Sequence, residues 1–157
     1  MTSWFVVNAR EASWWSWDGL GVYCPFEEKA EKFPQLGINL NVLEPGESLG
    51  MYHREEAQED FLVLAGECVL LVEGEERPLR RWDFFHCPPS TEHMIVGVGD
   101  RPCLVLALGA RPSGAVRYPV SEVALRYGAG VKIATDSPAE AYADRARPER
   151  CPPPELP

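Results

Sequence analysis

The hydrophobic pattern of the chain is clearest from Leu36 to Leu43, where apolar and polar residues alternate with one exception. A period of two is typical of a β-strand, because successive side chains of a strand point to opposite faces. The apolar positions are Leu36, Ile38, Leu40 and Val42, and a Pro-Gly turn signal follows at residues 45–46. This segment is therefore predicted to be a strand.

Further strand-sized apolar segments follow at short spacing, with Gly or Pro between them. They occupy residues 61–65, 68–72, 77–82, 84–87, 93–98 and 103–108. Such a series, without a βαβ rhythm and without a phosphate-binding glycine loop, predicts an all-β sandwich or barrel. We expect the aromatic side chains of Trp82 and Phe84 to fill its interior.

The chain divides into three regions by composition. Residues 1–35 form a tryptophan-rich arm, residues 36–111 the β-barrel, and residues 112–157 a C-terminal extension. Within the extension, residues 120–127 are expected to form a short helix or a turn, and Ser137 with Glu140 has the spacing of a helix N-cap. The tail from residue 138 onward is rich in proline and charge, so we expect it to be extended and partly disordered or bound by a partner.

Four tryptophans lie in the first seventeen residues, at positions 4, 14, 15 and 17. So many indoles are not expected to remain in water. Either the arm packs across the open face of its own barrel, or it forms a dimer interface, where aromatic residues are enriched. The sequence leaves both interpretations open.

Composition narrows the class of protein. The 157 residues carry a net charge of -9 and contain no Lys/Arg block, which argues against a nucleic-acid or anionic-membrane partner. No signal peptide is visible, and no stretch approaches the roughly 20 apolar residues of a membrane span, so a cytoplasmic protein is expected. The five cysteines form no CxxC pair and are predicted to be free thiols, with Cys68, Cys87 and Cys103 in the core.

Candidate chemistry comes from histidines and carboxylates on neighbouring predicted strands. His53 and Glu55 share one face, Glu59 follows after a short bend, and His93 begins a later strand. Convergence of these groups predicts a site for one divalent transition metal, and the donor set suits Zn, Fe, Ni, Mn or Cu without selecting among them. The alternative is a hydrogen-bonded polar pocket without metal.

Three other residues have alternative interpretations. Glu56 could replace Glu55, whose side chain could instead face solvent. His86 could be a pocket base, although a structural or surface position is the stronger expectation. Tyr52 could contact a bound ligand or cap the rim of the barrel.

Two motifs resemble those of the cupin superfamily. The first family motif is G-x5-H-x-H-x3,4-E-x6-G, and here His53, Glu55 and Glu59 have its spacing, with Gly66 at its end and Glu55 at the second histidine position. Gly46 lies one residue further from His53 than the motif asks. A second registry would place Tyr52 and Arg54 at the ligand positions, which would argue against a metal.

The second family motif is G-x5-P-x-G-x2-H-x3-N. Pro88, Ser90 and His93 match its central part, with Ser90 in place of glycine and Gly97 in place of asparagine. The resemblance covers about residues 36–108. It implies a small single-domain cupin, that is, a double-stranded β-helix (jelly-roll) barrel, here with an N-terminal arm and a Pro-rich C-terminal tail.

For function, the resemblance implies a metal held by His53, Glu55, Glu59 and His93, a small-molecule ligand in the barrel, and a homodimer. Three roles follow from these features. The protein could be a metal-dependent enzyme acting on a small molecule, a non-catalytic binding module without a functional metal, or an accessory dimer clasped by its arm and tail. The sequence does not choose a reaction, because one fold hosts many chemistries.

Overall fold

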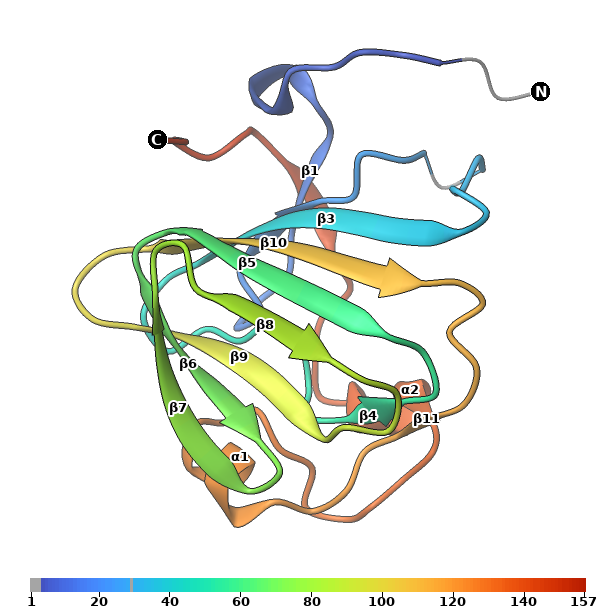
Figure 1. Cartoon of the computed structure of the whole chain (residues 1–157), viewed down its shortest axis with the longest axis vertical. Helices are drawn as coiled ribbons and strands as arrows, with labels where there is room; N and C mark the ends of the chain where they lie inside the picture. Colours follow the sequence, from blue (N-terminus) through green and yellow to red (C-terminus); the bar gives the residue numbers. More distant parts are fainter. Residues whose placement is uncertain (1–3, 29) are drawn as a thin grey trace.

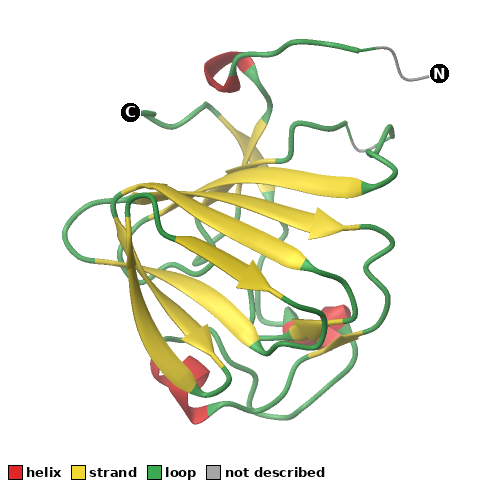
Figure 2. Cartoon of the chain, viewed as in Figure 1, coloured by secondary structure: helices red, strands yellow, loops and turns green. Residues whose placement is uncertain are grey.

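Two antiparallel β-sheets pack face to face in the computed structural model, which describes residues 4–28 and 30–157 (Figure 1). The larger sheet has the strand order β12-β1-β2-β3-β10-β5-β8, and the smaller has the order β7-β6-β9. A two-stranded sheet, β11-β4, lies beside them. Figure 2 shows how far strands outweigh helices in this fold.

The elements have the following bounds. The strands are β1 Trp14–Ser16, β2 Val22–Cys24, β3 Leu36–Leu43, β4 Arg54–Glu55, β5 Glu59–Ala65, β6 Glu67–Val72, β7 Glu75–Arg80, β8 Phe84–Cys87, β9 His93–Val98, β10 Cys103–Ala110, β11 Val116–Arg117 and β12 Glu149–Cys151. The helices are a short 3-10 turn at Ala9–Glu11, α1 at Glu122–Arg126 and α2 at Pro138–Ala141.

The core between the two sheets is built from alternate residues of their facing strands. Its buried members include Leu43 of β3, Val63 of β5, Leu70 of β6, Ile95 of β9 and Val105 of β10. Because these side chains come from both sheets, the strands enclose one common interior. This arrangement confirms the predicted all-β class with a jelly-roll architecture.

The alternation in β3 divides the strand into two unlike faces. Leu43 points into the interior, and Asn39 and Asn41 line a cavity there. Leu40 belongs to a separate cluster on the opposite face, where it packs with Trp14 and other apolar residues. The apolar side of the strand is therefore the side that the arm covers, and the polar side faces the barrel.

The tryptophan-rich arm extends the larger sheet. β2 pairs with β3, and β1 pairs with β2, so the arm continues the sheet rather than forming a separate region. Trp14 is fully buried, and the ring of Trp17 stacks on Tyr142 with 5.0 Å between the ring centroids. Trp4 is 89% exposed. Two of these tryptophans thus pack within the chain, while Trp4 remains at the surface.

Trp82 and Phe84 do not fill the barrel, and that expectation is wrong. The two side chains are 62% and 61% exposed. β8 is the last strand of its sheet, and Phe85 and Cys87 occupy its inward face. Phe84 falls on the outward face by alternation, and Trp82 lies in the preceding turn with a φ of 76°.

The C-terminal extension is ordered along most of its length. Ser121 caps α1, and the Ser137 side chain accepts a hydrogen bond from the Glu140 amide at the start of α2, as the sequence pattern predicts. The tail is extended, but its own chain holds part of it: β12 pairs with β1 in the register Trp14 to Cys151. Hydrogen bonding between β12 and β1 therefore orders this part of the tail, which was not expected to bury enough apolar surface to become ordered.

Four of the five free cysteines are buried, including Cys68, Cys87 and Cys103, which confirms their predicted place in the core. Within the described residues, no helix has the length and hydropathy that a membrane crossing would need.

Candidate metal centre

Three strand ends bring the candidate metal-binding residues together. His93 is the first residue of β9, Glu59 is the first residue of β5, and His53 immediately precedes β4. The two histidines form an antiparallel bridge, in which the His93 amide donates to the His53 carbonyl (2.9 Å) and the His53 amide donates to the His93 carbonyl (3.2 Å). Their rings lie with centroids 4.9 Å apart.

Both imidazoles meet the same carboxylate oxygen. Glu59 Oε2 lies 3.1 Å from His93 Nε2 and 3.4 Å from His53 Nε2. One ligand atom from each of the three residues lies within 4.8 Å of the others. The side chains are 2%, 12% and 19% exposed for His93, His53 and Glu59, so the cluster is largely shielded from water.

The three converging atoms have no hydrogen-bond partner within the described residues. They are His53 Nε2, Glu59 Oε2 and His93 Nε2, and all three are buried. Buried polar atoms are rarely left without a partner, since each such atom costs about 1–3 kcal/mol. Two nitrogen donors and one oxygen donor aimed at one point are the donor set of a transition-metal site, so these residues fit a bound metal ion.

The outward ring nitrogens orient the two imidazoles. His53 Nδ1 lies 2.8 Å from the Met51 carbonyl, and His93 Nδ1 lies 3.0 Å from the Thr91 carbonyl. A carbonyl only accepts, so each Nδ1 carries the proton and donates it. Each Nε2 then points toward Glu59, in the orientation that a metal-bound histidine requires.

Electrostatics favours a charged pair within the cluster. Burial opposes a charge on His53, but the carboxylates of Glu55 and Glu59 outweigh it and raise the pKa of His53 to about 10. Burial likewise opposes ionisation of Glu59, but the neighbouring imidazoles of His53 and His93 outweigh it and lower the pKa of Glu59 to about 2. An ion that binds here must displace the proton from His53.

Glu55 lies at the margin of this centre. Its Oε1 is 3.4 Å from His53 Nε2, and its side chain is 24% exposed, but it is not one of the three clustered residues. Glu56 faces elsewhere, toward the Ala115 amide. The structure thus brings together three of the four residues expected from the sequence, with the remaining one beside His53.

The alternative registry does not match the geometry. Tyr52 is fully buried, and its hydroxyl accepts a hydrogen bond from the Gly74 amide at 3.1 Å. Arg54 lines a different hollow together with Arg117. His86 is a surface residue, as expected: its side chain is 54% exposed, and its Nδ1 lies 2.7 Å from Asp60 Oδ1.

A small cavity of about 130 Å³ adjoins the metal centre. Besides His53, Glu59 and His93, its walls include the amides of Asn39 and Asn41 and the phenol of Tyr142. Sequence reasoning missed these three polar residues. The asparagines carried a usable signal, because they are polar at positions i and i+2 of a predicted strand, whereas Tyr142 lies in the tail and carried none.

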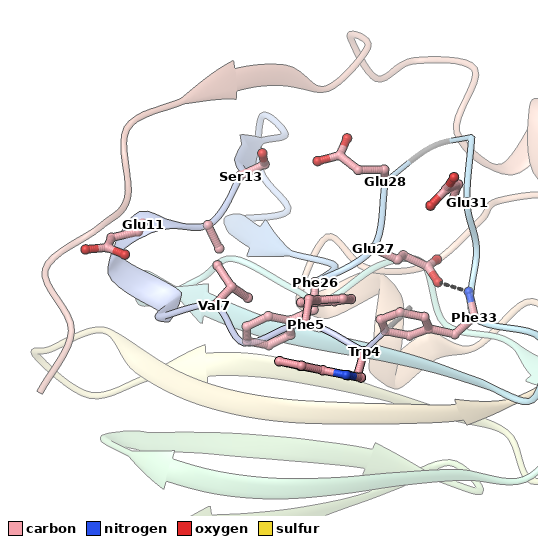
Figure 3. Close-up of a pocket in the computed structure, with 11 residues that line it drawn as sticks. Trp4, Phe5, Val7, Glu11, Ser13, Phe26, Glu27, Glu28, Glu31 and Phe33 are labelled. Atoms are coloured by element: carbon pink, nitrogen blue, oxygen red, sulfur yellow. Dashed lines mark hydrogen bonds between the residues drawn. The ribbon is translucent and has the colours of Figure 1, made fainter. Parts of the chain in front are cut away.

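A larger hollow of about 890 Å³ lies between the arm and the segment that leads into β3 (Figure 3). Its aromatic side chains are Trp4, Phe5, Phe26 and Phe33. Figure 3 shows that the Glu27 carboxylate accepts a hydrogen bond from the Phe33 amide, and that Glu28 and Glu31 lie nearby. His53, Glu59 and His93 do not line this hollow.

Comparison with known proteins agrees with this fold. The cupin domain family model matches residues 39–109. The chain is similar to the structure of a sugar phosphate isomerase from a cupin superfamily of Silicibacter pomeroyi, with 25% identity over 69% of this chain and 65% of that one, and a TM-score of 0.53. No curated protein matches the chain.

Two further structures are similar. A polyketide cyclase from Streptomyces resistomycificus is 15% identical over 60% of this chain and 68% of that one, with a TM-score of 0.53, which shows the fold alone. A DMSP lyase from Ruegeria pomeroyi is 27% identical over 54% of this chain and 43% of that one, with a TM-score of 0.46. The chain thus spans less than two thirds of both the isomerase and the lyase. The family match and the jelly-roll fold together support a cupin domain at residues 39–109.

Proposed function

We propose that this protein is a metal-dependent enzyme acting on a small molecule inside the cupin barrel. His53, Glu59 and His93 hold one divalent transition metal in this proposal, and Glu55 completes the set as a fourth ligand. The observation that carries the proposal is the convergence of three buried ligand atoms that lack hydrogen-bond partners within the described residues.

Nitrogen and oxygen donors leave Zn, Fe, Ni, Mn and Cu as candidate ions. When bound, such an ion acts as a Lewis acid that polarises an oxygen atom of the small molecule. The similarity to a sugar phosphate isomerase at 25% identity supports an enzymatic role. The similarity does not identify the small molecule on which this protein acts.

The protein's own side chains keep the centre rigid and partly dry. The ring of His93 packs against Phe61 and Phe85, with centroid distances of 5.5 and 5.9 Å. Met51 and Thr91 fix the two imidazoles through their carbonyls. Ligands held by packing and hydrogen bonds in this way need little rearrangement when the ion binds.

The decisive experiment is elemental analysis of protein purified without added metal. We expect about one transition-metal ion per chain, as in mononuclear protein sites. His93→Ala should lose most of it, because the most deeply buried donor is gone. His86→Ala is the matched control and should keep it, since His86 is a surface residue bonded to Asp60. Equal metal content in both variants would contradict the site.

We further propose that the protein is a homodimer in the cytoplasm. Exposed aromatic surface at Trp4 and Phe5 supports a contact between copies, since such residues are enriched at interfaces. Five free cysteines support a reducing compartment. Light scattering should give twice the chain mass, and Trp4→Ser should shift the protein toward monomer. A monomeric wild-type protein would end the dimer proposal.

A further inference from the structure

The cavity beside the metal centre has one polar wall and one apolar wall. Asn39, Asn41 and Tyr142 contribute hydrogen-bonding groups, whereas Leu49, Phe61 and Ile95 contribute apolar surface. A polar wall inside a barrel is costly unless its groups find partners. The hydrogen bonds that these groups already make within the protein therefore show which donors and acceptors remain free for a ligand.

Asn41 is one of few buried polar residues of the described chain, with 9% exposure. Its Nδ2 makes a single long contact of 3.4 Å with the Val105 carbonyl. A side-chain amide has two N–H donors and an oxygen that accepts two hydrogen bonds. Most of the hydrogen-bonding capacity of Asn41 is thus free to meet a molecule in the cavity.

Tyr142 reaches the cavity from outside the cupin domain, at the end of α2. Its hydroxyl accepts a hydrogen bond from the Met51 amide at 3.0 Å, and the Met51 carbonyl in turn holds His53 Nδ1 at 2.8 Å. The Trp17 ring, stacked on Tyr142, fixes the phenol in place. Since the hydroxyl uses a lone pair toward Met51, its proton is left to donate.

Size restricts what the cavity can hold. Its volume of about 130 Å³ is well below the roughly 300 Å³ of pockets for drug-sized ligands. An apolar cavity of about 150 Å³ binds benzene, so a molecule of up to about six heavy atoms fits here.

The bound ion restricts the ligand further. With His53, His93 and the carboxylates of Glu55 and Glu59 around it, a divalent ion is formally neutralised, but an ion of higher coordination number would keep open positions that an oxygen donor can take. The free donors on Asn41 and Tyr142 also favour an oxygen anion, and the apolar wall suits a short hydrocarbon part.

We propose that the cavity binds a small carboxylate of two or three carbons, with its oxygens hydrogen-bonded by the Asn41 amide and the Tyr142 hydroxyl. This assignment rests on the proposed metal function, because the carboxylate lies beside the bound ion. It makes Asn41 and Tyr142 the residues that select the ligand, one from the cupin domain and one from the C-terminal extension.

The test uses the full chain loaded with Co²⁺, whose visible absorption reports changes around the ion. Glycolate and L-lactate are titrated in, and we expect both to shift the spectrum with saturation. Citrate, with about twice as many heavy atoms as the cavity admits, should not. Tyr142→Phe and Asn41→Leu should each weaken glycolate binding about fivefold to tenfold, the usual effect of one lost hydrogen bond.

Tyr127→Phe is the matched control, because this tyrosine ends α1 and does not line the cavity. Its glycolate affinity should equal that of the wild type. The melting temperature and cobalt content of each variant show whether it is folded and loaded with metal. If Tyr142→Phe does not fold or does not bind cobalt, Asn41→Leu alone tests the proposal.

The outcomes separate the two proposals. Failure of the wild-type protein to bind Co²⁺ would overturn the metal function itself. Stoichiometric Co²⁺ binding without a response to glycolate or lactate would overturn only the carboxylate assignment. That assignment also fails if the folded variants bind glycolate as tightly as the wild type, or if citrate binds equally well.

Discussion

His53 and His93 face each other across a single β-bridge, and this residue-scale arrangement fixes the geometry of the centre. The sequence predicted that His53, Glu55, Glu59 and His93 would converge, and ligand atoms of His53, Glu59 and His93 do lie within 4.8 Å of one another. Glu55 lies beside His53, as alternation along a strand predicts. Its place outside the cluster depends on the path of the short β4, which no periodic pattern encodes.

Glu55 and Glu59 are expected to contribute unequally to metal binding. Glu59→Gln should abolish retention of the ion, because both imidazoles converge on its oxygen. Glu55→Gln should keep the stoichiometry but weaken affinity about tenfold, as changes at the margin of metal sites usually do. Titration of the metal-free variants with Zn²⁺ against a competing chelator measures both. Equal losses would make Glu55 as important a ligand as Glu59.

Glu27 and Arg111 form a second residue-scale feature, remote from the metal centre. Arg111 binds both carboxylate oxygens of Glu27, at 2.7 and 2.9 Å. This hydrogen bonding lowers the pKa of Glu27 below its ordinary value of 4.5, against the opposing effect of burial. A lowered folded-state pKa means that the pair stabilises the fold above pH 4.5, and that this contribution is lost as the pH falls through the folded-state value.

Urea unfolding between pH 7 and pH 3 checks this expectation. Glu27→Gln should lose about 2 kcal/mol at neutral pH, the scale of a hydrogen bond to a charged group. It should also show a shallower loss of stability in acid than the wild type. The exposed Glu149→Gln is the control and should retain the wild-type acid dependence. If Glu27→Gln lost stability in acid as steeply as the wild type, the proposed contribution of the Glu27–Arg111 pair would be refuted.

At the scale of elements, two left-handed glycines connect the strands of the barrel under different constraints. Gly66, between β5 and β6, has a φ of 72°, and a Cβ there would meet the Pro102 carbonyl oxygen at 2.5 Å. Gly74, in the β6–β7 turn, has a φ of 79°, and no atom lies within 4 Å of its Cβ position. The first glycine permits a close backbone approach, whereas the second serves only the turn.

Substitution by alanine separates these two effects. Gly74→Ala should cost about 1 kcal/mol for the left-handed backbone alone. Gly66→Ala should cost clearly more, about 2–4 kcal/mol, because backbone atoms must also move. Equilibrium urea denaturation gives both values. Similar losses would mean that the contact with Pro102 is easily relieved.

The strands themselves were predicted well, including β8 at residues 84–87, but the burial expected for Trp82 and Phe84 at that edge of the sheet was wrong. β3, β5, β6, β9 and β10 follow their apolar patterns because each has a face in the interior. β8 has aromatic residues on both faces, so its pattern gave no sign that Phe84 would point to solvent. Ser90 is a second example of a feature that the sequence pattern does not show. Its φ of 68° is a conformation that favours glycine, the residue that the cupin motif has there, but a serine in the sequence does not indicate such a backbone conformation.

The whole molecule is closed by contacts between its two terminal regions, and the sequence did not predict this. β12 pairs with β1, and Arg10 donates a hydrogen bond to the Pro157 carbonyl. Pairings between distant segments leave no local pattern, so the tail showed only its proline and charge content. A separate long-range contact, the stacking of Tyr142 on Trp17, holds Tyr142 at the cavity.

Removal of the tail tests this closure. Deleting residues 147–157 removes β12 and Leu156 from the cluster around Trp14 and should cost about 2 kcal/mol or more, the value of uncovering one large side chain. Deleting only residues 152–157 keeps β12 and should cost less. Tyr142 remains in both variants, so metal content should not change. If both truncated proteins melted at the same temperature as the full-length protein, the β1–β12 pairing would contribute nothing to stability.

The β1–β12 pair also has a consequence for the order of events during synthesis. Trp14 and Cys151, which face each other in the pair, are separated by 151 − 14 = 137 positions. At the usual rate of about 5–20 residues per second, a ribosome needs roughly 7–27 s to make that stretch. Until β12 has been made, the nascent sheet has an unpaired edge at β1, and an unpaired edge of this kind is prone to pair with another chain.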